Sequence, residues 1–126
     1  MSYKGNEMAE ITAYKLFRER KDGSLGPLFI NRKQVIPFAE WLLAECHPTK
    51  GFKVRPGWHC GARPTAPHLS KKGRIWCEVR IRDFWELKRP DHQGGLWMVA
   101  NQILLVRRLT ESEVLSLEQE NDLKSA

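Results

Sequence analysis

The segment from Ile75 to Arg82 alternates apolar and polar residues without interruption. Every second position is apolar, and the residues between them are large or charged: Ile75, Cys77, Val79 and Ile81 against Trp76, Glu78, Arg80 and Arg82. A period of two is typical of a strand that buries one face. The pattern therefore predicts a central strand with the Cys77, Val79 and Ile81 side chains toward a core, and a strand requires pairing partners in a sheet.

Further strands are predicted before and after this segment. Residues 11–17 alternate, and the turn residues 21–24 follow them, with Asp22-Gly23 suited to positive φ. The short apolar run 28–30 completes a predicted hairpin over residues 11–32 with a long loop. Residues 96–99 and 102–106 are predicted as two consecutive strands or as one strand broken at Ala100-Asn101.

Two segments have helical features. Residues 35–45 fit a helical stripe that begins at Pro37, but the same residues also fit an extended segment, and the period does not decide between the two. Thr110 and Glu113 form a capping box that predicts the start of a C-terminal helix. Together these features predict an α+β fold with a curved, mostly antiparallel sheet.

The length of 126 residues and the ordinary globular composition predict one domain. We expect a flexible N-terminus over residues 1–10, a single α+β domain over 11–109, and a C-terminal helix with a frayed tail over 110–126. No apolar run is long enough to span a bilayer, so no membrane partner is expected. Three cysteines without framework spacing indicate free thiols in a reducing compartment, and we expect a cytoplasmic location.

The formal net charge of +6 is distributed unevenly. Residues 50–89 contain eleven Lys or Arg against three acidic residues, whereas residues 111–126 contain five acidic residues against one Lys. A basic centre predicts an anionic partner, either a small molecule or a macromolecule that includes nucleic acid. A solvated basic face without a partner is the alternative reading.

The stretch 57–69 combines Gly and Pro with chemically capable side chains, among them Trp58, His59, Cys60 and His68. Backbone-setting residues around such side chains are typical of a site or of a tightly built turn. Zinc is not favoured, because no Cys-x-x-Cys or His-x-x-x-His spacing occurs, so no metal site is predicted. A Cys60 nucleophile is also not favoured, because a buried, inert cysteine is the commoner case.

Nucleic-acid binding is a further reading of the basic centre. Basic residues lie between Trp58, Trp76 and Phe84, and such an arrangement can form a stacking groove. The same alternation is also typical of a solvated sheet face on which arginine stems cover an indole ring. The sequence contains no named nucleic-acid-binding motif.

Several short motifs resemble a family of small uncharacterised bacteriophage proteins. These are residues 14–18 with the turn 21–24, then Gly57-Trp58-His59-Cys60, Ala66-Pro67-His68-Leu69 and Gln93-Gly94-Gly95. The resemblance covers residues 11–107. It implies a phage-encoded protein acting in the cytoplasm of a bacterial host, and it implies no particular activity.

The order of these elements is also distantly similar to the ADP-ribosyltransferase fold, as in poly-ADP-ribose polymerases. In this resemblance Arg18 takes the position that holds the ADP-ribose half of NAD, and His59 and His68 take the positions of the two tyrosines of that fold. Cys77-Glu78-Val79 and Gln102-Ile103 match the later strands. The resemblance implies a split sheet with a cleft.

The catalytic glutamate of that fold would fall near Leu96, where this chain has no carboxylate. Gln93 is the nearest polar residue, and an amide cannot stabilise an oxocarbenium-like charge as a carboxylate does. We therefore expect transferase activity to be weak or absent, and the missing carboxylate favours binding over catalysis.

Two hypotheses follow. In the first, the protein binds a nucleotide-like anion, with an NAD or ADP-ribose derivative as the ligand, in a basic cleft lined by Arg18, Trp58, His59, His68 and Gln93. In the second, it is an anti-defence or host-modulating protein whose basic face contacts a host protein or nucleic acid.

Overall fold

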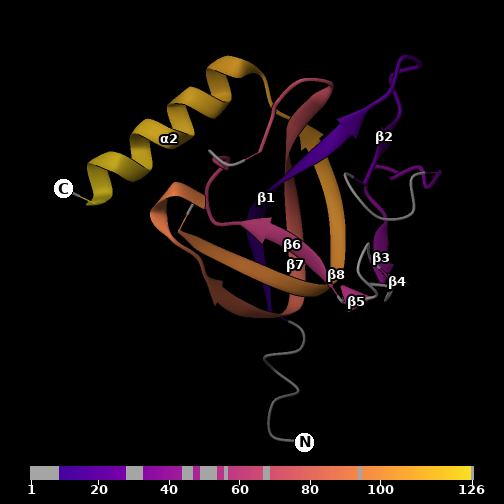
Figure 1. Ribbon diagram of the computed structural model, residues 1–126, viewed down its shortest axis with the longest axis horizontal. Coiled ribbons are helices and arrows are strands. Elements are labelled where there is room, and N and C mark those ends of the chain that lie inside the picture. Colours follow the sequence, from indigo (N-terminus) through magenta and orange to yellow (C-terminus); the bar gives the residue numbers. More distant parts are fainter. Residues whose placement is uncertain are drawn as a thin grey trace, which may run out of the picture.

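The computed structural model describes residues 9–27, 33–43, 47–48, 54–55, 57–66, 69–93 and 95–125. The chain is mostly β-structure followed by one helix (Figure 1). The elements in order are β1 (Glu10–Glu19), β2 (Leu25–Gly26), β3 (Trp41–Leu43), β4 (His47–Pro48), β5 (Val54–Arg55), β6 (Trp58–Gly61), β7 (Arg74–Lys88), the short 3-10 helix η1 (Asp91–Gln93), β8 (Leu96–Arg108) and α2 (Glu111–Ser125).

The main sheet closes into a small barrel. β1 pairs with β7, β7 with β8, β8 with β6, and β6 returns to β1 through the pair Tyr14–Gly61, all antiparallel. β2 extends β1 at one end, and β3 extends β8 beside the start of β6. β4 and β5 form a separate two-stranded ladder. A parallel bridge between Phe38 and Leu105 is the exception to the antiparallel pairing of the described strands.

The β7–β8 hairpin supplies the curvature that lets the sheet close. Its ladder has an irregularity between Glu78 and Val79, and β-bulges of this kind increase bending and twist. Asp83 lies in the middle of β7 with φ of 53°, and its carboxylate accepts a hydrogen bond of 3.0 Å from the Asn101 amide on β8. The two long strands therefore bend at their centres and wrap around the core.

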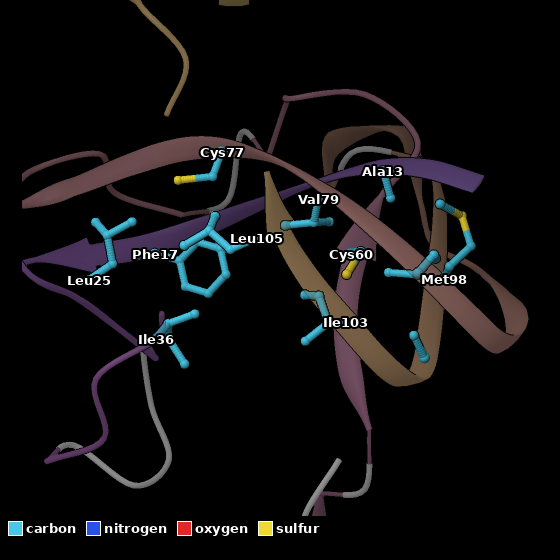
Figure 2. Close-up of a cluster of buried hydrophobic side chains, with 12 residues drawn as sticks. Ala13, Phe17, Leu25, Ile36, Cys60, Cys77, Val79, Met98, Ile103 and Leu105 are labelled. Carbon is cyan, nitrogen blue, oxygen red and sulfur yellow. The ribbon is translucent and has the colours of Figure 1, made fainter. Parts of the chain in front are cut away.

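The barrel interior is filled by apolar side chains from β1, β2, β6, β7 and β8 and from the segment before β3 (Figure 2). Figure 2 shows Phe17 from β1, Val79 from β7 and Ile103 from β8 directed toward this interior, with Ile36 approaching from one end. Val79 and Ile81 are fully buried. The predicted inward face of the central strand is thus confirmed.

A second apolar cluster lies outside the barrel, beneath α2. Leu16 and Trp76 lie directly opposite each other on β1 and β7 and pack with Trp97, Leu109 and Val114. Trp76 is only 4% exposed, so this part of the outer face is covered rather than solvated. Alternation had placed Trp76 opposite the core without indicating that a helix covers it.

The capping box at the start of α2 is confirmed. The Glu113 amide donates to Thr110 Oγ1 over 3.2 Å, and Glu113 Oε1 accepts from the Thr110 amide over 3.0 Å. Glu113 also pairs with Arg107. The hydrogen bond from the Thr110 amide, followed by the one from Arg107, lowers the pKa of Glu113.

Other expectations are refined by the structure. The strand that pairs with the end of β1 is Leu25–Gly26, so the hairpin closes earlier than expected, and the predicted strand 28–30 lies outside the described residues. The described part of 35–45 contains no helix: it turns at Ala39 and forms β3 at 41–43. β8 runs from 96 to 108 as one strand. The curved, mostly antiparallel sheet with a C-terminal helix is confirmed, and the finer likeness to the ADP-ribosyltransferase fold stays a prediction.

Candidate functional site

Arg18 and Arg74 are directly opposed on neighbouring strands. Arg18 is near the end of β1, Arg74 begins β7, and the two are paired in the antiparallel register. Directly opposite residues project from the same face of a sheet, with Cβ atoms about 5 Å apart. This is the outer face, since the preceding outer row is Leu16–Trp76 and Phe17 between the rows points inward. Both arginines are half-buried.

Two turns lie beside this pair at the same end of the barrel (Figure 1), and exposed lysines lie on both turns. The turn before β7 is closed by the Arg74 amide, which donates to the Lys71 carbonyl over 3.0 Å, and Lys71 and Lys72 are exposed on it. The turn after β1 carries the exposed Lys21. The Glu19 amide donates to the Gly73 carbonyl over 2.9 Å, so the two turns lie side by side.

Arg108 reaches this end of the barrel from the last residue of β8. It donates to the Gly23 carbonyl and approaches Glu19, with Nε 3.7 Å from Oε2. Its guanidinium also lies 5.4 Å from the ring centre of Phe38, a side chain that is 45% exposed. We call Arg18, Lys21, Lys71, Lys72, Arg74 and Arg108 the basic end of the barrel.

The carboxylates of the basic end are engaged in local contacts. Glu19 approaches Arg108. Asp22 accepts from the Ser24 hydroxyl over 2.7 Å and from the Ser24 amide over 2.9 Å, and these bonds lower the pKa of Asp22. Among the residues named here, all within the described part of the chain, six cations and two carboxylates give a formal charge of +4. The basic end is therefore a concentrated positive surface, suited to an anion.

Trp58 and His59, which were expected to line one site, project from opposite faces of β6. Trp58 packs against the barrel core, and Cys60 belongs to that core. Because successive strand residues alternate, His59 faces outward, and its cross-strand neighbour is Val99. Arg18 lies beside β2 and β7, whereas His59 lies beside β8.

Lys15 contacts the backbone of β6. Its Nζ donates to the His59 carbonyl over 2.8 Å and lies 5.8 Å from the centre of the Phe17 ring. This half-buried cation on the core-facing side of β1 was missed in the sequence because it occupies an apolar position in the alternation of 11–17.

Gln93 and His68 are the two remaining residues of the predicted binding site. Gln93 lies in η1, which follows the end of β7, whereas Arg74 begins β7. Gln93 is therefore far from Arg74 along this strand. Its carbonyl accepts from Trp97 Nε1 over 2.6 Å, and its side chain accepts from Arg89 over 3.3 Å. These contacts give Gln93 a role in holding the loop. His68 lies outside the described residues.

Cys60 and Cys77, the two cysteines in the part of the chain that the structure describes, are unsuited to nucleophilic chemistry at neutral pH. Burial raises the pKa of Cys60 to about 11 and that of Cys77 to about 12, although Lys15 near Cys60 and Arg108 near Cys77 act in the opposite direction. Over the described part of the chain, no group of three or more His, Cys, Asp and Glu side chains is arranged to hold a metal ion. Leu96, at the position expected for a catalytic glutamate, pairs with Lys88.

The pairing of Arg18 with Arg74 was not predicted, since the two residues are far apart in the sequence and only the strand register joins them. The sequence signal that could have indicated it is the basic turn 70–74 directly before the central strand.

No helix in the described residues is long and apolar enough to cross a membrane. No family model matches the chain, and no curated protein or solved structure shows significant similarity to it.

Proposed function

We propose that the protein binds a phosphate-bearing ligand of the nucleotide class at the basic end of its barrel. NAD and ADP-ribose derivatives are the first candidates for this ligand. The observation that carries the proposal is the direct opposition of Arg18 and Arg74. Two guanidinium groups on one face of neighbouring strands can contact one phosphate together, and guanidinium groups form strong, charge-assisted hydrogen bonds to phosphate.

The proposed role is binding without transferase activity, or with weak activity. In support of this role, Leu96 and its partner Lys88 supply no carboxylate where the resemblance would require one. The raised pKa values of Cys60 and Cys77 also disfavour a thiolate nucleophile. The distant likeness to the ADP-ribosyltransferase fold, a bacteriophage origin and action in the cytoplasm of a bacterial host belong to this proposal.

The second candidate function is that of an anti-defence or host-modulating protein that contacts a host macromolecule. The exposure of Lys71 and Lys72 favours this candidate, because lysines at the tip of a turn present charge to a surface as readily as to a small molecule. It differs from the first candidate in requiring a macromolecular partner.

Thermal shift with NAD, ADP-ribose, cyclic nucleotides and inorganic phosphate tests the proposal. A ligand at one hundred times its dissociation constant stabilises the native state by about 2.7 kcal/mol, which raises the melting temperature by several degrees. We expect Arg18→Ala and Arg74→Ala to lose this shift. Arg80→Ala is the matched control, because Arg80 lies on the same strand pair opposite Thr12 and bonds to Glu10.

Arg74→Glu separates binding from folding. This variant places opposite charges across the β1–β7 pair, so the ligand-free protein should melt at an equal or higher temperature while the ligand response disappears. A ligand shift that survives in both Arg18→Ala and Arg74→Glu would refute the proposed site. A shift that is reduced equally in Arg80→Ala would also contradict it.

A further inference from the structure

We propose that the ligand of the basic end is a strand of single-stranded nucleic acid. This inference rests on the proposed function and goes beyond it, because it names a polymer that contacts the protein with several phosphates and at least one base. Two features that a mononucleotide does not require support it: the spread of the cations and the exposed aromatic ring beside Arg108.

The cations come from separate segments of the barrel end. Arg18 and Arg74 project from the outer face of β1 and β7. Lys21 lies on one turn, and Lys71 and Lys72 lie on the other. The two turns adjoin through the backbone hydrogen bond from Glu19 to Gly73.

Arg108 extends the basic end to the opposite face of the sheet, because it is paired with the core-facing Cys77 and donates to the Gly23 carbonyl from the end of β8. The basic end thus follows a path from the sheet face, over two turns, to the end of β8. A polyanion with regularly spaced phosphates matches such a path better than one phosphate group does.

The second feature is Phe38, which has 45% of its surface exposed although it is a large apolar residue. Arg108 holds its guanidinium 5.4 Å from the centre of this ring. An aromatic ring beside cations is the arrangement with which proteins stack an unpaired base while they contact the backbone. Bases in a duplex are already stacked on one another, so an exposed ring of this kind favours a single strand.

Fluorescence anisotropy with labelled oligothymidylates tests the inference. Lengths of roughly four, eight and sixteen nucleotides span the site sizes of small barrels that bind single strands. We expect affinity to rise steeply from thymidine monophosphate to the eight-nucleotide strand. A duplex of the same length should bind more weakly. The logarithm of the affinity should fall linearly with the logarithm of the salt concentration.

Substitutions separate the phosphate contacts of the arginines from the stacking of a base on Phe38. Arg18→Ala with Arg74→Ala should reduce the salt slope by about 1.4, since each lost phosphate contact on a single strand contributes about 0.7. Phe38→Ala should weaken binding by about tenfold and leave the slope unchanged. Phe38→Trp should retain affinity, which shows that the ring rather than the fold is responsible, and Arg80→Ala should match the unmodified protein in both respects.

Each result decides between the two proposals. Binding of the monophosphate as tight as that of the oligomers, equal binding of the duplex, or full affinity in Phe38→Ala would overturn the single-strand inference while the phosphate site stands. If no phosphate-bearing ligand of any length binds, or if binding is unchanged in the Arg18→Ala, Arg74→Ala double variant, the proposed function fails as well.

Discussion

Replacing Gly57 with Ala is the perturbation whose consequence follows most directly from the geometry. Gly57 precedes β6 and has φ of 84°, a conformation that costs an L residue about 1–2 kcal/mol. A Cβ atom at this position would lie 2.4 Å from Val99 Cγ1 on β8. Val99 is only 4% exposed, so it cannot move aside without repacking, which costs about 1–3 kcal/mol. We expect Gly57→Ala to lower the free energy of unfolding by about 2–5 kcal/mol.

Gly23→Ala is the matched control. Gly23 has nearly the same φ, 86°, but no heavy atom of the described residues lies within 4 Å of the Cβ position. This variant should therefore show the backbone cost alone, about 1–2 kcal/mol. The difference between the two variants measures the contact with Val99.

Urea unfolding followed by tryptophan fluorescence gives both values, since the chain contains five Trp. In a Val99→Ala background the contact with Cγ1 is absent, and the cost of Gly57→Ala should fall to that of Gly23→Ala. The coupling between the two positions should thus be of the order of 1–3 kcal/mol. Equal costs for Gly57→Ala and Gly23→Ala in the unmodified background would refute the close approach of Gly57 to β8.

Two further predictions concern other parts of the fold. Ala39 has φ of 58°, so Ala39→Gly should remove about 1–2 kcal/mol of backbone strain. The added entropy of the unfolded chain should cost about 0.5–1 kcal/mol. The melting temperature should therefore rise slightly, and a lower melting temperature would contradict this. In a Cys46→Ser background, Cys60 and Cys77 should resist thiol reagents at pH 8 until the protein unfolds. Their pKa values are about 11 and 12 against an ordinary 9.0, so the unfolded thiols ionise first. The free energy of unfolding should therefore fall as pH rises from about 9 to about 11, and an equally steep fall in Cys60→Ala would exclude this cause.

Alternation was enough to predict the core-facing residues of β7. Cys77, Val79 and Ile81 are all buried as expected, because the period of two is a direct consequence of strand geometry. The cover over Trp76 could not be predicted in the same way. α2 contacts the sheet through few apolar residues, chiefly Val114 and Leu117, and so its docking face has little periodic signal.

The pairing partners were harder to predict than the strands. Leu25 and Gly26 are too short a segment to give a strand pattern, yet they pair with the end of β1 because the turn at 20–24 returns the chain directly. In the same way, sequence patterns indicated Arg18 as a binding residue but could not identify Arg74. The register that brings them together depends on contacts along the whole β1–β7 ladder.

The register also explains why Glu19, the carboxylate nearest to Arg18 in the sequence, projects from the face opposite to the Arg18–Arg74 pair. Glu19 follows Arg18 directly, but neighbouring residues of a strand project from opposite faces. Glu19 instead approaches Arg108 at the end of β8, on the other side of the ladder. A carboxylate at position 74 would stabilise the strand pair, and the chain carries arginine there. Two opposed arginines at a strand end, beside turns that add exposed lysines, gather positive charge at one end of the barrel, and this arrangement is the basis of the proposed anion site.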